Sequence, residues 1–221
     1  MQPARYDFHA HTVLSDGELL PIEMIRIARV LGYRAVAITE HLGADDPAPL
    51  LKRLRQECEM GSGGFGITAL WGVEITHVPP KYIPRVADRA RKAGARIILV
   101  HGETLVEPVA SGTNIAALNS DIDILAHPGL LSRREADIAA KRGIFIELTS
   151  RQGHSYTNGH VARVGTAAGA PLLLNSDSHA AKDMIGRHMA LRIALGAGLR
   201  PLDVRKALVD NPRKLLRKIM K

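Results

Sequence analysis

Residues 35–41 read AVAITEH, a run of mostly apolar side chains that ends in a carboxylate and an imidazole. A segment that is apolar at nearly every position is typical of a parallel β-strand buried on both faces. Residues 97–101, IILVH, and residues 171–177, PLLLNSD, repeat the pattern. Each of these predicted strands therefore ends in a side chain that can bind a metal ion.

Segments of this kind alternate with amphipathic segments along the whole chain. We expect strands at 5–9, 34–39, 68–75, 96–101, 122–126, 144–148 and 171–175. We expect helices between them at 21–31, 47–59, 83–93, 104–118, 132–141, 158–168 and 183–195, followed by helices at 201–209 and 212–220. The Gly-Ser-Gly-Gly stretch at 61–64 predicts a loop. Seven strand–helix repeats predict an α/β fold, and the polar strand ends favour a β/α barrel over an open doubly wound sheet.

Composition sets the broad class of protein. The chain has 221 residues, 46% of them hydrophobic, and shows no break in composition, so we expect one domain that spans residues 1–221. Its single cysteine, Cys58, lies in a predicted helix and is interpreted as structural, because a disulfide or a thiolate cage needs at least two sulfurs. The N-terminus lacks the layout of a signal peptide, and no apolar run approaches the ~18 residues that span a bilayer. We therefore expect a soluble, cytoplasmic protein with no membrane partner.

The formal net charge is +8. Many of the basic residues recur at helical spacing on the predicted outer helices, which is typical of a solvated face. Aromatic residues make up 4% of the chain and leave little surface on which the bases of single-stranded nucleic acid could stack. We therefore interpret the charge mainly as that of solvated helix faces, and we expect a small phosphorylated substrate, and not nucleic acid, as the partner.

Residue types that bind metal ions recur at the ends of six of the seven predicted strands. They include His9, His11, His41, Glu74, His101, His127, Asp177 and His179. Any one of these alone could be a hydrogen-bonded core histidine, a salt-bridge partner or a helix cap. In a parallel barrel, however, the C-terminal ends of all strands surround one mouth. Without cations, this many buried imidazoles and carboxylates at one end of the barrel would carry a large desolvation cost. We therefore predict a metal site there.

Other polar residues near the strand ends have more than one interpretation. Glu40, Glu103 and Glu147 either orient the imidazoles or cap the barrel loops. Arg151 and His154 follow the sixth strand and are candidates for substrate contact. The remaining histidines are interpreted as a loop residue, a helix-face residue and a surface residue, namely His77, His160 and His188.

These motifs resemble those of the PHP (polymerase and histidinol phosphatase) superfamily over essentially the whole chain. The resemblance rests on His9-Ala10-His11, Ser15-Asp16-Gly17, Thr39-Glu40-His41, Glu74, His101, Ala126-His127-Pro128 and Ser176-Asp177-Ser178-His179. It implies a distorted (β/α)7 TIM-like barrel with two or three divalent metal ions, Zn, Mn or Fe. By this resemblance the first ion would be held by His9, His11, Glu74 and Asp177, the second by Glu74, His101 and His127, and the third by Asp16, His41 and His179.

Within the superfamily the chain looks closest to histidinol-phosphatase-like proteins, which implies hydrolysis of a phosphate monoester such as histidinol phosphate or a similar small metabolite. Three dications and three carboxylates would leave about +3 to face the phosphate. Glu74 would bridge two ions, and a metal-bridging hydroxide would be the nucleophile. Arg151 would stabilise charge in the transition state, and His154 is a candidate to protonate the leaving group.

Three alternatives stay open at this point. The basic charge favours a phosphodiesterase or nuclease that uses the same metal site. A non-catalytic barrel that binds a phosphorylated ligand is a second alternative, although the complete set of ligands argues against it. Amidohydrolases also begin with His-x-His, but they often bridge their metals through a carboxylated lysine at the fourth strand, where this chain has Val100-His101.

Overall fold

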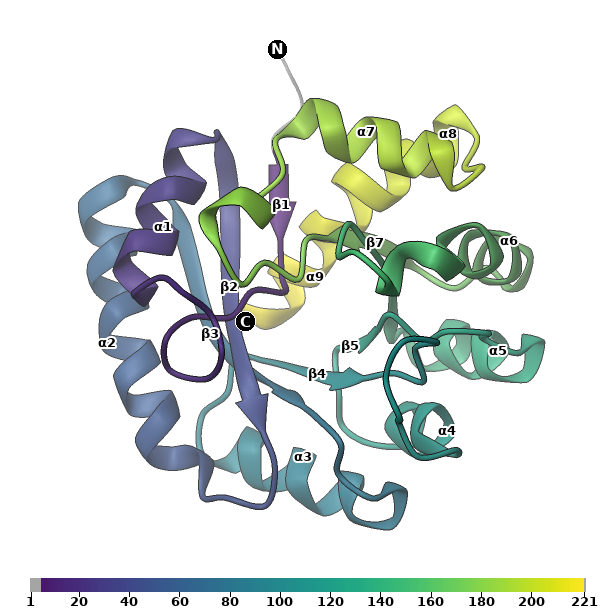
Figure 1. Ribbon diagram of the computed structural model, residues 1–221, viewed down its shortest axis with the longest axis horizontal. Coiled ribbons are helices and arrows are strands. Elements are labelled where there is room, and N and C mark those ends of the chain that lie inside the picture. The colour runs from purple at the N-terminus through teal and green to yellow at the C-terminus, as the bar shows by residue number, and fades with distance from the viewer. Residues whose placement is uncertain (1–4, 221) are drawn as a thin grey trace.

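The computed structural model describes residues 5–220 and shows a ring of parallel strands with helices around it (Figure 1). The strands are β1 (Arg5–Asp7), β2 (Tyr33–Leu42), β3 (Thr68–Ile75), β4 (Ile97–His101), β5 (Ile124–Ala126), β6 (Phe145–Thr149) and β7 (Leu172–Asn175). Each strand pairs in parallel with the next along the chain. This order confirms the predicted (β/α)7 TIM-like barrel.

Helices follow the strands, and most of them cover the outside of the ring (Figure 1). They are α1 (Pro21–Val30), α2 (Pro47–Phe65), α3 (Ile83–Lys92), α4 (Thr113–Leu118), α5 (Arg133–Arg142), α6 (Asn158–Ala168), α7 (Arg187–Gly196), α8 (Pro201–Arg205) and α9 (Asn211–Ile219). Short 3-10 helices occupy Pro80–Tyr82, His154–Thr157 and Ala181–Asp183, and a π-helical turn occupies Lys206–Asp210. Within residues 5–220, no helix is both long and apolar enough to cross a membrane.

Two predicted segments are wrong. Residues 61–64 continue α2 instead of forming a loop, because Gly61 lets the helix approach α1 so closely that a Cβ there would lie 2.8 Å from the Ile25 side chain. Conversely, the predicted helix at 104–118 forms only at Thr113–Leu118. Pro108 stands within the missing part, and a proline disfavours helical geometry at the residue before it. Residues 102–112 are consequently a long loop at the end of β4.

The ring is nearly closed where β1 meets β7. The β-type pairing there is an isolated parallel bridge between Ala10 and Ser178, just beyond the two strands, with a hydrogen bond from the His11 amide to the Ser178 carbonyl at 2.8 Å. The Phe8 amide also donates to the side chain of Asn175 at 3.0 Å. The first segment to carry histidines is thereby held beside the last strand, so residues from the two ends of the sequence meet at one mouth.

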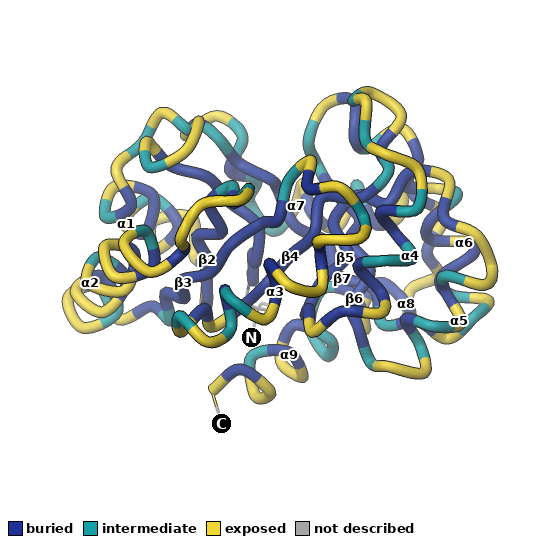
Figure 2. Tube along the Cα trace, turned by 90° about the horizontal axis from the view of Figure 1, so that it is seen from below, coloured by how far each residue is buried: buried dark blue, intermediate teal, exposed yellow. Residues whose placement is uncertain are grey.

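Apolar side chains form two layers, one inside the ring and one between the ring and its helices. The inner layer includes Phe8, Leu99 and Phe145, together with Leu215 and Ile219 of α9. Helix α9 crosses the end of the barrel opposite the loops that follow the strands (Figure 2). It therefore fills the bottom of the barrel, and the polar strand ends are left at the other end.

The α9 plug gives a test of the fold. Leu215 is fully buried, so Leu215→Ala should lower the free energy of unfolding by roughly 2 to 5 kcal/mol, because a cavity opens at the base of the inner core. Denaturant unfolding measures this. Leu202→Ala is the matched control, since Leu202 is 61% exposed on α8 and should change stability by less than about 0.5 kcal/mol. Equal effects of the two substitutions would contradict the plug.

Candidate metal centre

Strand alternation aims several of the polar side chains into the barrel. On β3, Glu74 lies four residues after Leu70 of the inner core and therefore shares its inward face. On β4, His101 is likewise two residues after the inner Leu99. Both polar side chains are at least 96% buried. The apolar lower half of the barrel thus gives way to ionisable groups at the mouth.

Two of these residues reach the centre through unusual backbone geometry. His127, directly after β5, and Asp177, shortly after β7, have φ angles of 23° and 52°. Non-glycine residues seldom adopt positive φ, and such residues cluster at functional sites. Regular alternation would have placed His127 on the face opposite the inner Ala126, so the turn in the backbone is what brings its imidazole to the mouth.

The innermost group consists of two imidazoles between two carboxylates. His9 Nε2 lies 3.2 Å from Glu74 Oε2 and 3.5 Å from Asp177 Oδ1. His11 Nε2 lies 3.4 Å and 3.3 Å from the same two oxygens. All four side chains are at least 96% buried. The four residues expected to hold a first cation are therefore brought together.

Several atoms of the cluster have no hydrogen-bond partner. The Nε2 atoms of His9 and His11, both nitrogens of His127 and both carboxylate oxygens of Glu74 are buried and unpartnered. Leaving so many polar atoms unsatisfied costs about 1–3 kcal/mol for each. Ligand atoms ~2.0–2.1 Å from a tetrahedral cation lie ~3.3 Å apart, which matches the spacing of this group. The donor set therefore fits a divalent cation.

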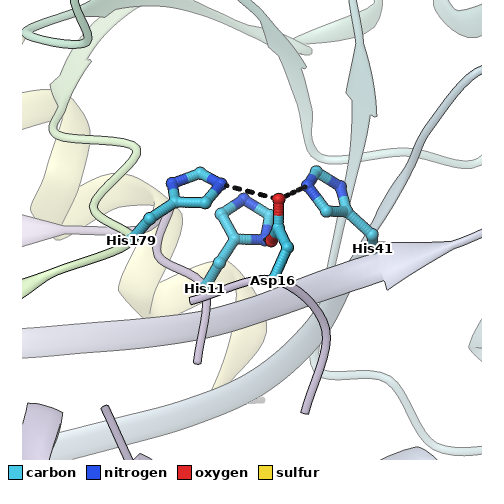
Figure 3. A group of neighbouring side chains, drawn as sticks. All are labelled: His11, Asp16, His41 and His179. Atoms are coloured by element: carbon cyan, nitrogen blue, oxygen red, sulfur yellow. Dashed lines mark ion pairs between the residues drawn. The ribbon is translucent and has the colours of Figure 1, made fainter. Parts of the chain in front are cut away.

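A second group lies nearer to the surface (Figure 3). Asp16 Oδ2 is 3.4 Å from His41 Nε2 and 3.3 Å from His179 Nε2, and Figure 3 shows the carboxylate between the two rings with His11 beside it. The opposite ring nitrogens are occupied, since His41 Nδ1 contacts Thr76 Oγ1 at 2.7 Å and His179 Nδ1 contacts the Asp177 carbonyl at 3.0 Å. Both imidazoles are thus oriented with Nε2 toward Asp16, as ligands of a common cation would be.

A third group surrounds the other side of Glu74. His127 Nε2 lies 3.5 Å from Glu74 Oε1, so the two oxygens of Glu74 face different imidazoles. The ring of His101 meets that of His127 edge-on at a centroid distance of 4.4 Å. His101 Nε2, however, contacts Glu107 at 3.1 Å, a residue that the sequence did not indicate. Glu107 belongs to the loop that had been predicted to be helical.

The carboxylates of Glu40, Glu103 and Glu147, which were expected either to orient imidazoles or to cap loops, have different roles. Glu147 Oε2 accepts from His9 Nδ1 at 2.8 Å and so orients that imidazole. Glu40 instead accepts hydrogen bonds from the Thr12 amide and from the hydroxyls of Thr12 and Ser15, and these bonds hold the loop after β1. Glu103 accepts from two backbone amides where the loop after β4 joins α4, and so closes that loop. These amides belong to Gly112 and Asn114.

The carboxylates and imidazoles of the cluster shift one another's pKa values. Burial alone would raise the pKa values of Glu74 and Asp177, but the neighbouring imidazoles outweigh it and hold both pKa values well below the usual range. Burial alone would lower the pKa of His11, but Asp177 and Glu74 raise it to about 9. Without cations, the carboxylates thus hold protons on the imidazoles. Cations must displace those protons to bind.

The two predicted substrate residues lie on different sides of the mouth. Arg151 lines a cavity of about 670 Å³ together with Asp16, His179 and Lys182, and its guanidinium contacts Asp183 at 3.4 Å. His154 lies instead in a 3-10 helix, stacked on His127 at 4.2 Å. Burial and the charge of His127 lower the pKa of His154 to about 4. His154 is thus neutral near pH 7, which suits a metal ligand better than a proton donor.

Of the three histidines outside the predicted site, one lies beside the cluster and two lie on outer helices. His160 lies on α6 and its Nε2 contacts the Leu131 carbonyl at 2.8 Å, and His188 lies on α7. His77 lies in the turn after β3, with a φ of 53°, and its Nε2 contacts Glu107 at 3.2 Å. His77 therefore borders the cluster, whereas His160 and His188 lie on the outer helices α6 and α7.

Glu147 offers a test of how the cluster is supported. The change Glu147→Gln keeps the shape of the side chain but removes the charge that orients His9, so we expect cation affinity to fall about 10- to 100-fold. Competition with a chelator of known affinity measures this. Glu59→Gln is the matched control, because Glu59 is 54% exposed on α2 and contacts Arg55. Unchanged affinity in Glu147→Gln would mean that the carboxylate does not support a ligand.

Sequence comparison finds relatives that cover nearly the whole chain. An uncharacterized protein of Methanocaldococcus jannaschii is 44% identical over 218 residues, 97% of this chain and 100% of that protein. Ribonuclease P protein component 3 of Methanosarcina mazei is 27% identical over 233 residues, 98% of this chain and 90% of that protein. A "Probable phosphatase" of Shewanella loihica is 26% identical over 230 residues, 95% of this chain and 91% of that protein. No protein-family model matches the chain.

Solved structures of several other proteins share the fold. A chain of the cryo-EM structure of archaeal Ribonuclease P with mature tRNA matches with a TM-score of 0.68 and 17% identity, over 96% of this chain and 89% of that one. Histidinol phosphate phosphatase of Lactococcus lactis, complexed with zinc, L-histidinol and phosphate, matches with a TM-score of 0.60 and 15% identity, over 97% and 93%.

The fold and the mouth together define the class of protein, a seven-stranded β/α barrel with imidazoles and carboxylates clustered at its C-terminal end. Among such barrels, this chain belongs to the PHP superfamily, to which its phosphatase and Ribonuclease P relatives point.

Proposed function

We propose that this protein is a metal-dependent phosphoesterase that hydrolyses a phosphate monoester. The observation that carries the proposal is Glu74, a fully buried carboxylate whose two unpartnered oxygens face different imidazoles, Oε2 toward His9 and His11 and Oε1 toward His127. A buried anion in this position fits a bridge between two cation sites.

Nine residues would hold the cations in the proposed centre, and Glu74 would serve two sites. They are His9, His11, Asp16, His41, Glu74, His101, His127, Asp177 and His179. When bound, two or three divalent ions such as Zn, Mn or Fe supply a Lewis acid for phosphoryl oxygens and acidify a bound water toward neutral pH. Imidazole ligands suit all three metals, so the residues do not select one of them.

The side chains around the centre would bind and orient the substrate. Asp16 and His179 form one wall of the cavity that Arg151 and Lys182 also line, so a phosphate at the centre could reach the cavity's two cationic side chains. Arg151 can offer two parallel N–H donors to phosphoryl oxygens. Its present partner, Asp183, is 24% exposed and would be exchanged for the stronger dianion.

The relatives support a small monoester as the substrate. One relative bears the name of a phosphatase, and a protein of the same fold binds zinc, L-histidinol and phosphate. We therefore propose histidinol phosphate or a similar phosphorylated metabolite. The test compares histidinol phosphate and an aryl phosphate with a bis-aryl phosphodiester and a short RNA, using Mn²⁺- and Zn²⁺-loaded protein. Cleavage of the diesters alone would overturn the monoesterase proposal.

A second candidate function comes from the Ribonuclease P relative. The likeness to Ribonuclease P protein component 3 extends over 98% of this chain, and the net charge of +8 would favour a polyanion. In this alternative the barrel would bind RNA or an RNA–protein assembly without turnover. Tight, salt-dependent RNA binding that persists in chelator, together with inactivity on every ester tested, would favour it over the phosphoesterase.

Arg151 provides the prediction specific to substrate binding. Replacement by methionine removes the charge but keeps much of the length, so Arg151→Met should raise KM for the monoester about 10- to 100-fold, as expected for the loss of a charged hydrogen-bond pair. Steady-state kinetics measures this, with Arg133→Met, on the exposed face of α5, as the control. A KM equal to that of the unchanged protein would place the substrate elsewhere.

A further inference from the structure

The loop at residues 102–112 carries one carboxylate into the mouth of the barrel. Its base is fixed, because Glu103 accepts from the amides of Gly112 and Asn114 at 3.0 and 2.9 Å. Asn114 in turn accepts from the Glu103 amide and donates to the Pro128 carbonyl. The tip of the loop is thereby held over the third group of the cluster, and Glu107 points inward from it.

Glu107 contacts imidazoles from two other segments of the mouth. One oxygen lies 3.1 Å from His101 Nε2, and the other lies 3.3 Å from His154 Nε2. Both spacings allow the two atoms to bind one cation, because ligand atoms ~2.0–2.1 Å from a cation lie at most about 4.2 Å apart. The same oxygen that contacts His101 also lies 3.2 Å from His77 on the outer side.

His154 is oriented as a ligand would be. Its Nδ1 contacts Thr104 Oγ1 at 2.7 Å, so Nε2 is the nitrogen left for the cluster. Nε2 faces Glu107 and also lies 4.0 Å from Asp177 Oδ2. The side chain is 93% buried and its ring stacks on His127. Donor nitrogens of His101, His127 and His154 lie within 4.8 Å of one another, as a cation with three imidazole ligands requires.

We propose that His154 and Glu107 are additional ligands of the second cation, which would then have five protein ligands: Glu74, His101, His127, His154 and Glu107. The proposal rests on the metal centre of the proposed function but extends its ligand set beyond the nine residues indicated by the sequence. It also gives the cation sites different roles. A second cation enclosed by the chain leaves the cavity side, at Asp16 and His179, as the place where substrate enters.

A competing arrangement uses the same loop differently. His77, His101 and Glu107 also offer donor atoms within 4.8 Å of one another and could form a separate, outer cation site. His77 is 44% exposed, contacts the same Glu107 oxygen as His101 and stacks on the His101 ring, whereas His154 is buried and contacts the other Glu107 oxygen. The two arrangements therefore differ in whether His77 or His154 is needed for the cation that Glu107 binds.

The test uses the full chain loaded with Co²⁺, whose visible absorption depends on coordination number. Metal equivalents are counted, affinities are measured by chelator competition, and spectra are compared for Glu107→Gln, His154→Gln and His77→Gln, with Glu59→Gln as the surface control. We expect Glu107→Gln and His154→Gln each to weaken one site at least about 10-fold and to intensify its absorption, because the coordination number falls. His77→Gln and Glu59→Gln should match the unchanged protein.

Two results would overturn the proposal. One is unchanged affinity and absorption in both Glu107→Gln and His154→Gln while the unchanged protein binds its full complement, which leaves the proposed function intact. The other is a cation lost from Glu107→Gln and His77→Gln but retained by His154→Gln, which assigns the outer site instead. Glu107 lies on a partly exposed loop, so its variant should fold even if His154→Gln does not. Failure of the unchanged protein to bind any cation would count against the proposed function itself.

Discussion

Glu74→Gln is expected to lower phosphomonoesterase activity about 10³-fold or more while the barrel stays folded. The change removes a carboxylate that faces both His9 and His127 and that would serve two cations, so two proposed cation sites lose a charged ligand at once. Asp177 also faces both imidazoles, at 3.5 and 3.7 Å, but is expected to bind the first cation only. A single lost electrostatic contact to a transition state already costs about 10²–10³ in rate. Metal analysis of the variant should show a loss of bound cation, and circular dichroism should be unchanged.

The comparison needs a control of the same chemistry. Glu59→Gln makes the identical change on the exposed face of α2 and should leave activity within about twofold, since surface substitutions shift little. Glu147→Gln, which removes a carboxylate behind His9, should fall between the two. Activity of Glu74→Gln close to that of the unchanged protein would show that the phosphoester is not hydrolysed at this centre.

Three residues of the first cation group were predictable from the alternation of side chains along an extended chain, whereas Asp177 reaches the centre through a positive φ. Glu74 lies on the inward face of a strand whose inward Leu70 is already apolar and buried, and His9 and His11 alternate at i and i+2. Once parallel strands are expected, their polar ends must share one mouth. The resemblance to the PHP superfamily added Asp16, which no strand carries.

Glu107 was missed because loops have no periodicity. The segment around it reads as part of a helix, and only the structure shows that Pro108 and the Glu103 cap turn it into a loop. His154 was found by its position after a strand, but the choice between proton donor and ligand depends on which ring nitrogen Thr104 occupies. Such contacts arise from tertiary packing between segments 50 residues apart, and no local pattern encodes them.

Removal of the cations is expected to produce the largest change in stability. A ligand that binds only the folded state stabilises it by about 2.7 kcal/mol at 100 times its Kd, so three sites would contribute about 8 kcal/mol. For a chain of this length each kcal/mol corresponds to roughly 2–4 °C in Tm. Chelation should therefore lower Tm by roughly 15 to 30 °C, and Mn²⁺ or Zn²⁺ should restore it in a thermal scan.

The difference in Tm between loaded and cation-free protein should depend on pH, and the protonation of the imidazoles sets the direction of that dependence. Without cations, the carboxylates raise the pKa of His11 to about 9 and that of His9 well above its ordinary value. Groups whose pKa is raised by folding stabilise the cation-free chain below their unfolded pKa of about 6.5 and lose that contribution as pH rises toward 9. Cations, by contrast, need deprotonated imidazoles and bind more tightly as pH rises.

The difference in Tm between loaded and cation-free protein should thus widen from pH 6 to pH 9. Scans at fixed ionic strength, with and without chelator, measure it, and proton release on metal addition gives an independent readout because each displaced proton leaves an imidazole. A gap that stays constant across this range would mean that His9 and His11 carry no protons in the cation-free chain. A gap below about 2 °C at every pH would mean that the buried cluster is satisfied without metal.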